Sequence, residues 1–428
     1  MTNAPRPVPL KLNDADIVRI IRKPADERTG AEVLRLIRFY GYSEPGLDQL
    51  VAAETKHRKS APLSSDTTIM ARAVSEARNR QETRVHIRGS FLNKGDAVEP
   101  GTPSILPPLV TRNAQADRLD LAQWIVADDN PLTSRVIVNR VWQQYFGRGL
   151  VATDDDFGTQ GERPSHPELL DWLATRFRQD NWSLKKLHKL IVMSATYRQS
   201  SHSRPELLQH DPYNTLLARQ NCLRVEAEIV RDLALSVSGL LNPKIGGPSV
   251  RPPQPADFAA LGFQGNVKWS VSEGRDRYRR GLYTFFQRTV PYPMLVDFDV
   301  ADSNTSCTKR ERSTSPLQAL TLWNDPVFVE CAQALGRRIV TESPSSETTD
   351  RLRFALRLTM SREAQPAELK TLVEYVEKQT NRFQSDFVTA KLLAGDGELP
   401  GHTTDTELAV WVSVARLLIN LDEFITRE

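Results

Sequence analysis

Helical periodicity dominates the middle of the chain. Between residues 117 and 201, apolar side chains recur every three or four positions, which places them on one face of successive α-helices. Polar residues that commonly cap helix N-termini precede each of these segments. The four predicted helices therefore begin at Asp117, at Thr133 or Ser134, at Ser165 and at Ser183.

Two of these helices carry the most detailed predictions. The second is expected to end at Gly147, with its apolar face inward: Val138, Val141, Trp142 and Tyr145. The third is expected to open with a capping box between Ser165 and Glu168, with Pro167 in its first turn. Its predicted buried residues are Leu169, Trp172, Leu173 and Phe177.

The same periodicity appears elsewhere, and strands are few. Helices are predicted before residue 54, where Asn13 or Asp14 can cap the first, and over 225–240, 327–340, 352–360, 367–383 and 406–421. A further helix is predicted to start at Pro316, after Thr314-Ser315. Residue type and alternation predict short strands at Arg84–Gly89 and Gly281–Arg288. The fold class is therefore mainly α, a multi-helix globular assembly with a few short β-strands.

Changes in composition divide the chain into five segments. They are a leading segment with a polar linker, an extended strand-containing connection, a helical motif-rich core, a Pro/Gly-rich loop region with a short strand, and a C-terminal helical region. Their bounds are 1–65, 66–116, 117–242, 243–312 and 313–428.

Composition narrows the class of protein. The chain has 428 residues, a net charge of +3 and an ordinary 39% of hydrophobic residues. This near-balance of charge argues against a dedicated nucleic-acid surface. The short basic runs Arg275–Arg280 and Lys309–Arg312 are expected to form ordinary surface or to pair within the molecule. The alternative is that the first run, with aromatic residues nearby, binds single-stranded nucleic acid or sugar rings. The sequence has no apolar stretch long enough to predict a membrane span, and its first residues do not resemble a signal peptide.

Three cysteines stand far apart in the sequence, at Cys222, Cys307 and Cys331. None belongs to a C-x-x-C or haem-attachment motif, so buried or free thiols are expected and their redox state is left open. No haem or other cofactor is therefore predicted in this chain.

Several long blocks resemble a planctomycete-specific domain of unknown function, which occurs in exported proteins behind a cytochrome c domain. The resemblance runs from about Arg84 to the end. The residues before Arg84 resemble the tail of a companion domain. The blocks that carry it are His86–Gly89, Leu92–Gly95, Ser134–Val151, Asp156–Gly158 with Gly161, Pro164–Leu173, Leu190–Ser201, Ser313–Leu320, Asn324–Pro326 and Leu421–Glu428.

This resemblance implies a setting outside the cytoplasm and a cytochrome c domain or secreted protein as partner. Any haem would belong to an absent or separate domain. The expected export signal and haem domain do not precede these blocks, so Met1 is expected to open a truncated or split product. The family has no known catalytic residues to carry over.

The loop Asp154-Asp155-Asp156 is the sharpest polar feature. Clustered carboxylates can hold a hard cation, which makes Asp154 and Asp156 weak metal candidates, although an EF-hand pattern fails here. The alternative is structural: Asp155 or Asp156 accepts backbone N–H groups or pairs with Arg148 or Arg163.

Two further residues are candidates for catalysis or for structure. Arg140 lies on a mostly apolar helix, either in a pocket wall or paired with an aspartate of the next loop. His166, in a helix's first turn, is either a neutral base or a packing residue with one hydrogen bond.

The sequence leaves open whether the chain is an enzyme. The leading hypothesis is an accessory or scaffold module that docks a haem domain or a secreted partner. The first alternative is a hydrolase of polysaccharide or sulfated polysaccharide that uses Asp154, Asp155 or Asp156 with His166 and Arg140. The second is an oxidoreductase subunit.

Overall fold

The computed structural model describes residues 15–40, 53, 56–57, 73–76, 82–255, 258 and 269–427. It divides into two compact units, Met1–Val98 and Glu99–Glu428. Helices dominate and the strands form only small two-stranded ladders within the described residues, so the predicted mainly α fold class is confirmed. Among the same residues, no helix is both long and apolar enough to cross a bilayer.

The first unit contains two short helices, α1 (Ala15–Arg22) and α2 (Gly30–Tyr40), joined by a 3-10 turn. Ile17 and Ile20 are buried. The Arg28 guanidinium donates to the carbonyls of Ile20, Ile21 and Lys23, so a side chain supplies the partners that the end of α1 lacks. The proposed caps Asn13 and Asp14 lie outside the described residues.

The first unit also contains a hairpin of β1 (Thr83–His86) and β2 (Lys94–Val98), which pair antiparallel. The predicted strand Arg84–Gly89 is thus confirmed only for its first half. The chain leaves the extended conformation at a 3-10 turn, where Arg88 has a positive φ of 54°.

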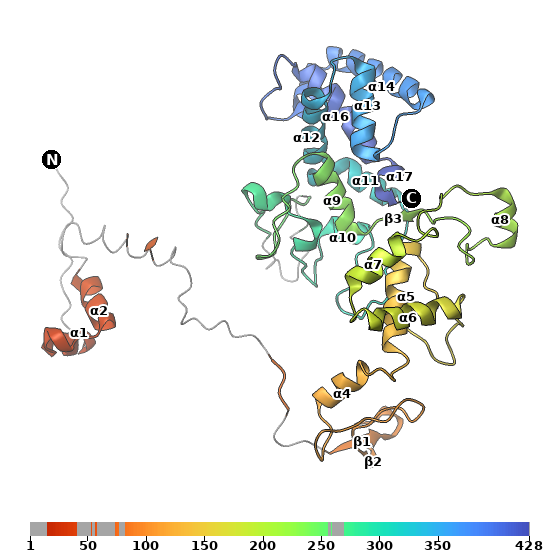
Figure 1. Ribbon diagram of the computed structural model, residues 1–428. Coiled ribbons are helices and arrows are strands. Elements are labelled where there is room, and N and C mark those ends of the chain that lie inside the picture. The colour runs from red at the N-terminus through yellow and green to blue at the C-terminus, as the bar shows by residue number, and fades with distance from the viewer. Residues whose placement is uncertain are drawn as a thin grey trace. The chain divides into compact units, whose positions relative to one another are not determined.

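The second unit has a large helical core. Helices α12 and α16 pack closely against each other, and α9, α11, α13, α14, α15 and α17 each contact one or both of them (Figure 1). The packing is close because Gly336 has no side chain: an added Cβ would lie 2.8 Å from Cγ2 of Val412. The elements of this core are α9 (Ala227–Val237), α10 (Pro293–Asp297), α11 (Pro316–Asn324), α12 (Pro326–Glu342), α13 (Thr348–Met360), α14 (Pro366–Ser385), α15 (Phe387–Ala394), α16 (Asp405–Ile419) and α17 (Asp422–Ile425).

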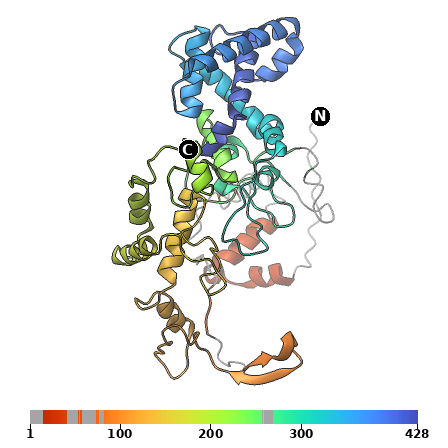
Figure 2. The same ribbon diagram turned by 90° about the vertical axis from the view of Figure 1, so that its right-hand side faces the viewer.

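A smaller core is built by three helices that precede it in sequence. In Figure 1 and Figure 2 these helices lie apart from the blue helices α12–α16. The helices are α5 (Thr133–Phe146), α6 (Pro167–Gln179) and α7 (Leu184–Val192). The short helices α4 (Arg118–Ile125) and α8 (Pro205–His210) flank them in sequence.

Most of the predicted caps are confirmed. Asp117 caps α4 in a capping box, Ser183 caps α7, and Gly147 ends α5 with a positive φ of 79°. The cap predicted for α5 is wrong, because Leu132 occupies that position and makes no side-chain cap bond.

Residues Gly281–Arg288 do not form the predicted strand. They contain a 3-10 turn at Gly281–Tyr283 and a single bridge from Thr284 to Val250. Asp232 holds the turn by accepting from Gly281 N at 2.6 Å and from Arg280 Nε at 2.7 Å. β-Branched and aromatic residue types predicted a strand, but no long neighbouring strand is present among the described residues to pair with it.

A short strand pair connects the two cores. β3 (Leu223–Arg224) pairs antiparallel with β4 (Thr426–Arg427). The Arg427 guanidinium then donates to the carbonyls of Gln144 and Tyr145, at the end of α5. A cation at a helix C-terminus is favourable, so the distant end of the described chain caps a helix of the smaller core.

Candidate functional site

Asn139 fixes the loop that follows α5. Its side chain is fully buried, donates to Val151 O at 2.9 Å and accepts from Val151 N at 2.8 Å. The close contact between Asn139 and Val151 requires a glycine at position 149. A Cβ on Gly149 would lie 2.6 Å from Asn139 Nδ2 and 2.5 Å from Val151 O. The loop carrying the predicted site residues is therefore held at its first turn by an amide.

The three loop aspartates have different surroundings. Asp154 is 7% exposed, and its Oδ2 has no hydrogen-bond partner among the described residues. Asp155 is exposed. Asp156 accepts from the backbone N–H of Gly158 at 2.7 Å, as the structural alternative for this loop predicted. That alternative fails for Arg148, which pairs with Glu162 instead.

His166 makes the single hydrogen bond that its packing alternative predicted, whereas Arg140 differs from its predicted setting. His166 Nδ1 lies 3.0 Å from Ser165 Oγ, a single hydrogen bond at the start of α6. His166 occupies the N-cap position and forms no side-chain cap bond, so the predicted capping box of Ser165 with Glu168 is wrong. Arg140 is exposed and makes no ion pair with a described residue, so its predicted pairing with a loop aspartate is wrong too.

The predicted site residues thus share a loop and its neighbouring helices, but no hydrogen bond or ion pair between described residues joins the aspartates to His166 or Arg140. Within the described part of the chain, no group of three or more His, Cys, Asp or Glu side chains is placed to hold a metal ion. The catalytic roles of Asp154, Asp155, Asp156, His166 and Arg140, and the metal role of Asp154 and Asp156, stay predictions.

An apolar groove lies between α5, α6 and α7. Its volume is about 680 Å³, and Trp142, Leu173 and Ile191 form its buried part. Trp172 was predicted to be buried but is 55% exposed, beside Met193 at 59%. The reason is visible in the sequence: Leu169-Leu170-Asp171-Trp172-Leu173 has more apolar residues than one helix face can bury.

Charged residues border this groove. Asp180 forms ion pairs with Lys186 at 3.2 Å and Arg176 at 3.0 Å, and the hydrogen bond from Lys186, aided by Arg176, lowers the pKa of Asp180. Lys189 also lines the groove and makes no ion pair with a described residue. The border therefore carries an excess of positive charge.

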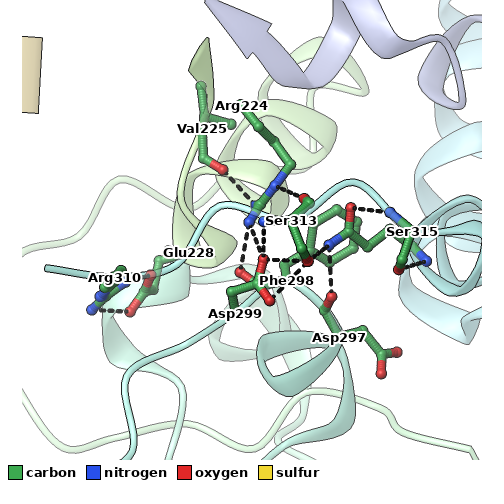
Figure 3. A network of polar contacts seen from close by, with 10 residues as sticks. Arg224, Val225, Glu228, Asp297, Phe298, Asp299, Arg310, Ser313 and Ser315 are labelled. Carbon is green, nitrogen blue, oxygen red and sulfur yellow. Dashed lines mark hydrogen bonds and ion pairs between the residues drawn. The ribbon is translucent and has the colours of Figure 1, made fainter. Parts of the chain in front are cut away.

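A polar network holds the segment 310–315 against the larger core. The Arg224 guanidinium donates to Asp299 Oδ2 at 2.6 Å and to Ser313 O at 2.9 Å, and Asp299 accepts from Ser313 N and Oγ (Figure 3). On one side Arg310 binds Glu228, and on the other Ser315 caps α11 in its predicted helix start. Nothing in the spacing of these residues predicted this network.

The predicted pairing of the basic run Arg275–Arg280 is confirmed for three of its arginines. Arg277 pairs with Glu330 and Arg280 pairs with Asp232. Arg279 is 1% exposed, donates to the carbonyls of 244, 246 and 248, and stacks on Tyr283. These cations are used inside the molecule, so this run does not form a free basic surface.

The three cysteines are free thiols, with Cys222 and Cys307 exposed and Cys331 buried. Burial raises the pKa of the Cys331 thiol to about 12. A thiol with such a pKa is protonated at neutral pH and is a poor nucleophile, so Cys331 serves as a core residue.

Comparison with known proteins gives one match. Residues 117–376 match the family model PSD1, described as "Protein of unknown function (DUF1553)". No curated protein and no solved structure matched the chain. The family model covers both cores up to α14 and spans well over half of the chain. The resemblance to a domain of unknown function is therefore confirmed, and the chain belongs to the DUF1553 family of proteins of unknown function.

Proposed function

We propose that this chain is an accessory module that docks a partner protein in the groove between α5, α6 and α7. The observation that carries the proposal is the exposure of Trp172 and Met193 at the edge of an apolar groove. Large apolar side chains gathered around one groove favour a binding surface over ordinary solvent exposure.

The groove suits an amphipathic helix as its occupant. Helices bind such grooves by inserting apolar side chains spaced three or four residues apart. Asp180 is already neutralised by Arg176 and Lys186, which leaves the charge of Lys189 uncompensated at the border. The occupant is therefore expected to carry acidic residues beside its apolar stripe.

The resemblance noted in the sequence suggests where this helix comes from. Related domains are expected to occur with a cytochrome c domain or a secreted partner. A haem-domain protein is thus the first partner to test. The proposed role is structural: the module holds the partner and performs no reaction in this groove.

The test measures binding of the purified chain to a c-type cytochrome protein from the same genome by biolayer interferometry. Truncating an aromatic residue that lies at the centre of an interface weakens binding by at least about tenfold, so Trp172→Ala is expected to do so. Leu190→Glu, which places a charge in the groove, is expected to have a larger effect.

Phe387 on α15 is a matched control, because it is 58% exposed and lies outside the groove. Phe387→Ala is expected to bind like the unchanged chain. Equal binding by Trp172→Ala, Leu190→Glu and Phe387→Ala would remove the groove from the proposal. Absence of binding by the unchanged chain would remove the haem-domain partner.

A further inference from the structure

A second cavity, of about 260 Å³, lies where the end of α5 meets β3 and the segment 309–312. Its volume is below the range of pockets for drug-sized ligands, so it has room only for a small molecule. Gly147 and Leu223 meet at its wall, where a Cβ on residue 147 would lie 2.7 Å from Leu223 Cδ2. The cavity belongs to the larger unit and is separate from the apolar groove.

Gln143 brings an unused amide to this cavity. The residue is only 4% exposed, and neither Nε2 nor Oε1 has a hydrogen-bond partner among the described residues. A buried amide without partners is costly, and most buried polar side chains are satisfied. The Gln143 side chain therefore offers both a donor and an acceptor to a molecule in the cavity.

Arg312 brings a cation that no carboxylate neutralises. Its one described hydrogen bond is a long one of 3.4 Å to Gln144 Oε1, and it makes no ion pair with a described residue. Burial, together with the nearby Arg427 and Arg224, lowers the pKa of Arg312, while Glu226 opposes this effect. Most of its N–H donors are available to a ligand.

The network in Figure 3 anchors the residues on either side of Arg312. Arg310, two residues before, binds Glu228 at 2.7 Å, and Ser313, directly after, binds Asp299 at 2.8 Å. Since both neighbours are anchored to the larger core, Arg312 is presented by a held segment. Such preorganisation reduces the conformational entropy that the protein loses when a ligand binds.

The other charges of the cavity limit the ligand to one negative group. Arg310 is occupied by Glu228 and lies 3.6 Å from Glu226. Lys309 and Glu311, both exposed, line the cavity with opposite charges. A polyanion would meet Glu226 and Glu311, whereas a single oxyanion can reach Arg312.

We propose that this cavity binds a small hydroxylated oxyanion. Its carboxylate or sulfate group accepts hydrogen bonds from Arg312, and a neighbouring hydroxyl exchanges hydrogen bonds with the Gln143 amide. Arginine suits this role because its planar donors match the two oxygens of such a group. The site is independent of the docking groove.

Calorimetric titration of the full chain with glycolate and with acetate tests the site. Glycolate is expected to bind in a saturable manner and more tightly than acetate, which lacks the hydroxyl. Arg312→Gln is expected to weaken every probe about tenfold or more, because charged hydrogen bonds are lost. Gln143→Leu is expected to weaken glycolate and to leave acetate unchanged.

Arg140→Ala is the matched control, since Arg140 lies on the same helix, is exposed and does not line the cavity. It is expected to bind like the unchanged chain. Arg312→Lys keeps the charge and guards against a folding defect; it is expected to bind weakly, with unchanged circular dichroism. Loss of binding in Arg140→Ala, equal binding in Arg312→Gln, or no saturable binding of any probe would overturn the proposal.

Discussion

Helices in the two cores of the larger unit differ in how many of their apolar side chains are buried. In α16 of the larger core, ten of fifteen residues are buried, from Leu408 to Ile419. In the smaller core, α6 and α7 bury one face each and leave Trp172, Leu184, Leu190 and Met193 substantially exposed. Helix α16 therefore has the features of a scaffold element, whereas α6 and α7 carry an exposed apolar surface beside a groove.

Polar groups follow the same division. In the larger core, Arg362 binds both Glu368 and Glu423, and its hydrogen bonds lower the pKa of Glu368 to about 2. At the end of α5, Gln143 and Arg312 lack such partners. Stability and binding are therefore expected to respond to changes in different regions of the molecule.

The largest expected effect is in the scaffold. Leu335 on α12 is fully buried, so Leu335→Ala is expected to lower the free energy of unfolding by about 2–5 kcal/mol through a cavity. Leu190→Ala, at the groove, is expected to cost less than about 0.5 kcal/mol. Urea denaturation followed by circular dichroism measures both, and equal costs would contradict the division.

A smaller effect is expected at the amide that anchors the loop. Asn139→Ala leaves the N–H and carbonyl of Val151 without their partners, at a cost of about 1–3 kcal/mol. The exposed neighbour Arg140→Ala is expected to change stability by less than about 0.5 kcal/mol. If both variants melt at the temperature of the unchanged chain, Asn139 does not anchor the loop.

Next in size is a dependence on pH in the scaffold. Burial raises the pKa of Asp325 from its usual 3.8 to about 6, although the carboxylate still accepts from Val327 N at the start of α12. Between pH 4 and 6 the folded chain keeps a proton that the unfolded chain has lost, so stability falls as pH rises through this window. Asp325→Asn removes this loss. Relative to the unchanged chain, its free energy of unfolding is expected to rise by on the order of 2 kcal/mol between pH 4 and 7.

Asp386 provides a control of opposite sign. It caps α15, and hydrogen bonds from the Thr389 hydroxyl and N–H lower its pKa. The unchanged chain therefore gains stability as pH rises through the ordinary range of carboxyl pKa values. Asp386→Asn lacks this gain, so it is expected to become less stable than the unchanged chain as pH rises. Denaturation at a series of pH values separates the two variants, and slopes of the same sign would rule out this assignment.

The smallest effect is expected at the cavity, where a substitution is expected to stabilise the chain. Gln143→Leu replaces a buried amide that lacks partners, so the free energy of unfolding is expected to rise by about 1 kcal/mol. Exposed Gln144→Leu serves as the comparison and is expected to be neutral. A destabilised Gln143→Leu would mean that this amide is satisfied in the folded chain.

The helices were predictable because their signals are local. Asp117, Ser183 and Ser315 cap the helices they precede, and Gly147 ends α5, since capping depends only on neighbouring residues. Helices α8 and α15 were not predicted from the sequence. The strand predicted at Gly281–Arg288 failed because pairing depends on a distant neighbour.

The candidate sites depended on packing and were harder to predict. The sequence pointed to the loop at Asp154–Asp156, whereas the groove depends on Trp172 being left uncovered. The spacing of Asn139 and Gln143 on one helix face allowed a polar pocket wall, but the cavity itself depends on Leu223 and the segment 309–312, which are distant in sequence. Trp172 was predicted to be buried, although the surplus of apolar residues at 169–173 could have indicated that one side chain of α6 would remain exposed.

The bonds from Arg427 to the end of α5 have a consequence for synthesis. Arg427 donates to Tyr145 across a separation of 282 residues. Since chains fold from the N-terminus as the ribosome makes them, α5, α6 and α7 can assemble long before their last stabilising contact is translated. A nascent chain that stalls before β4 would expose an uncapped helix end to chaperones and proteases.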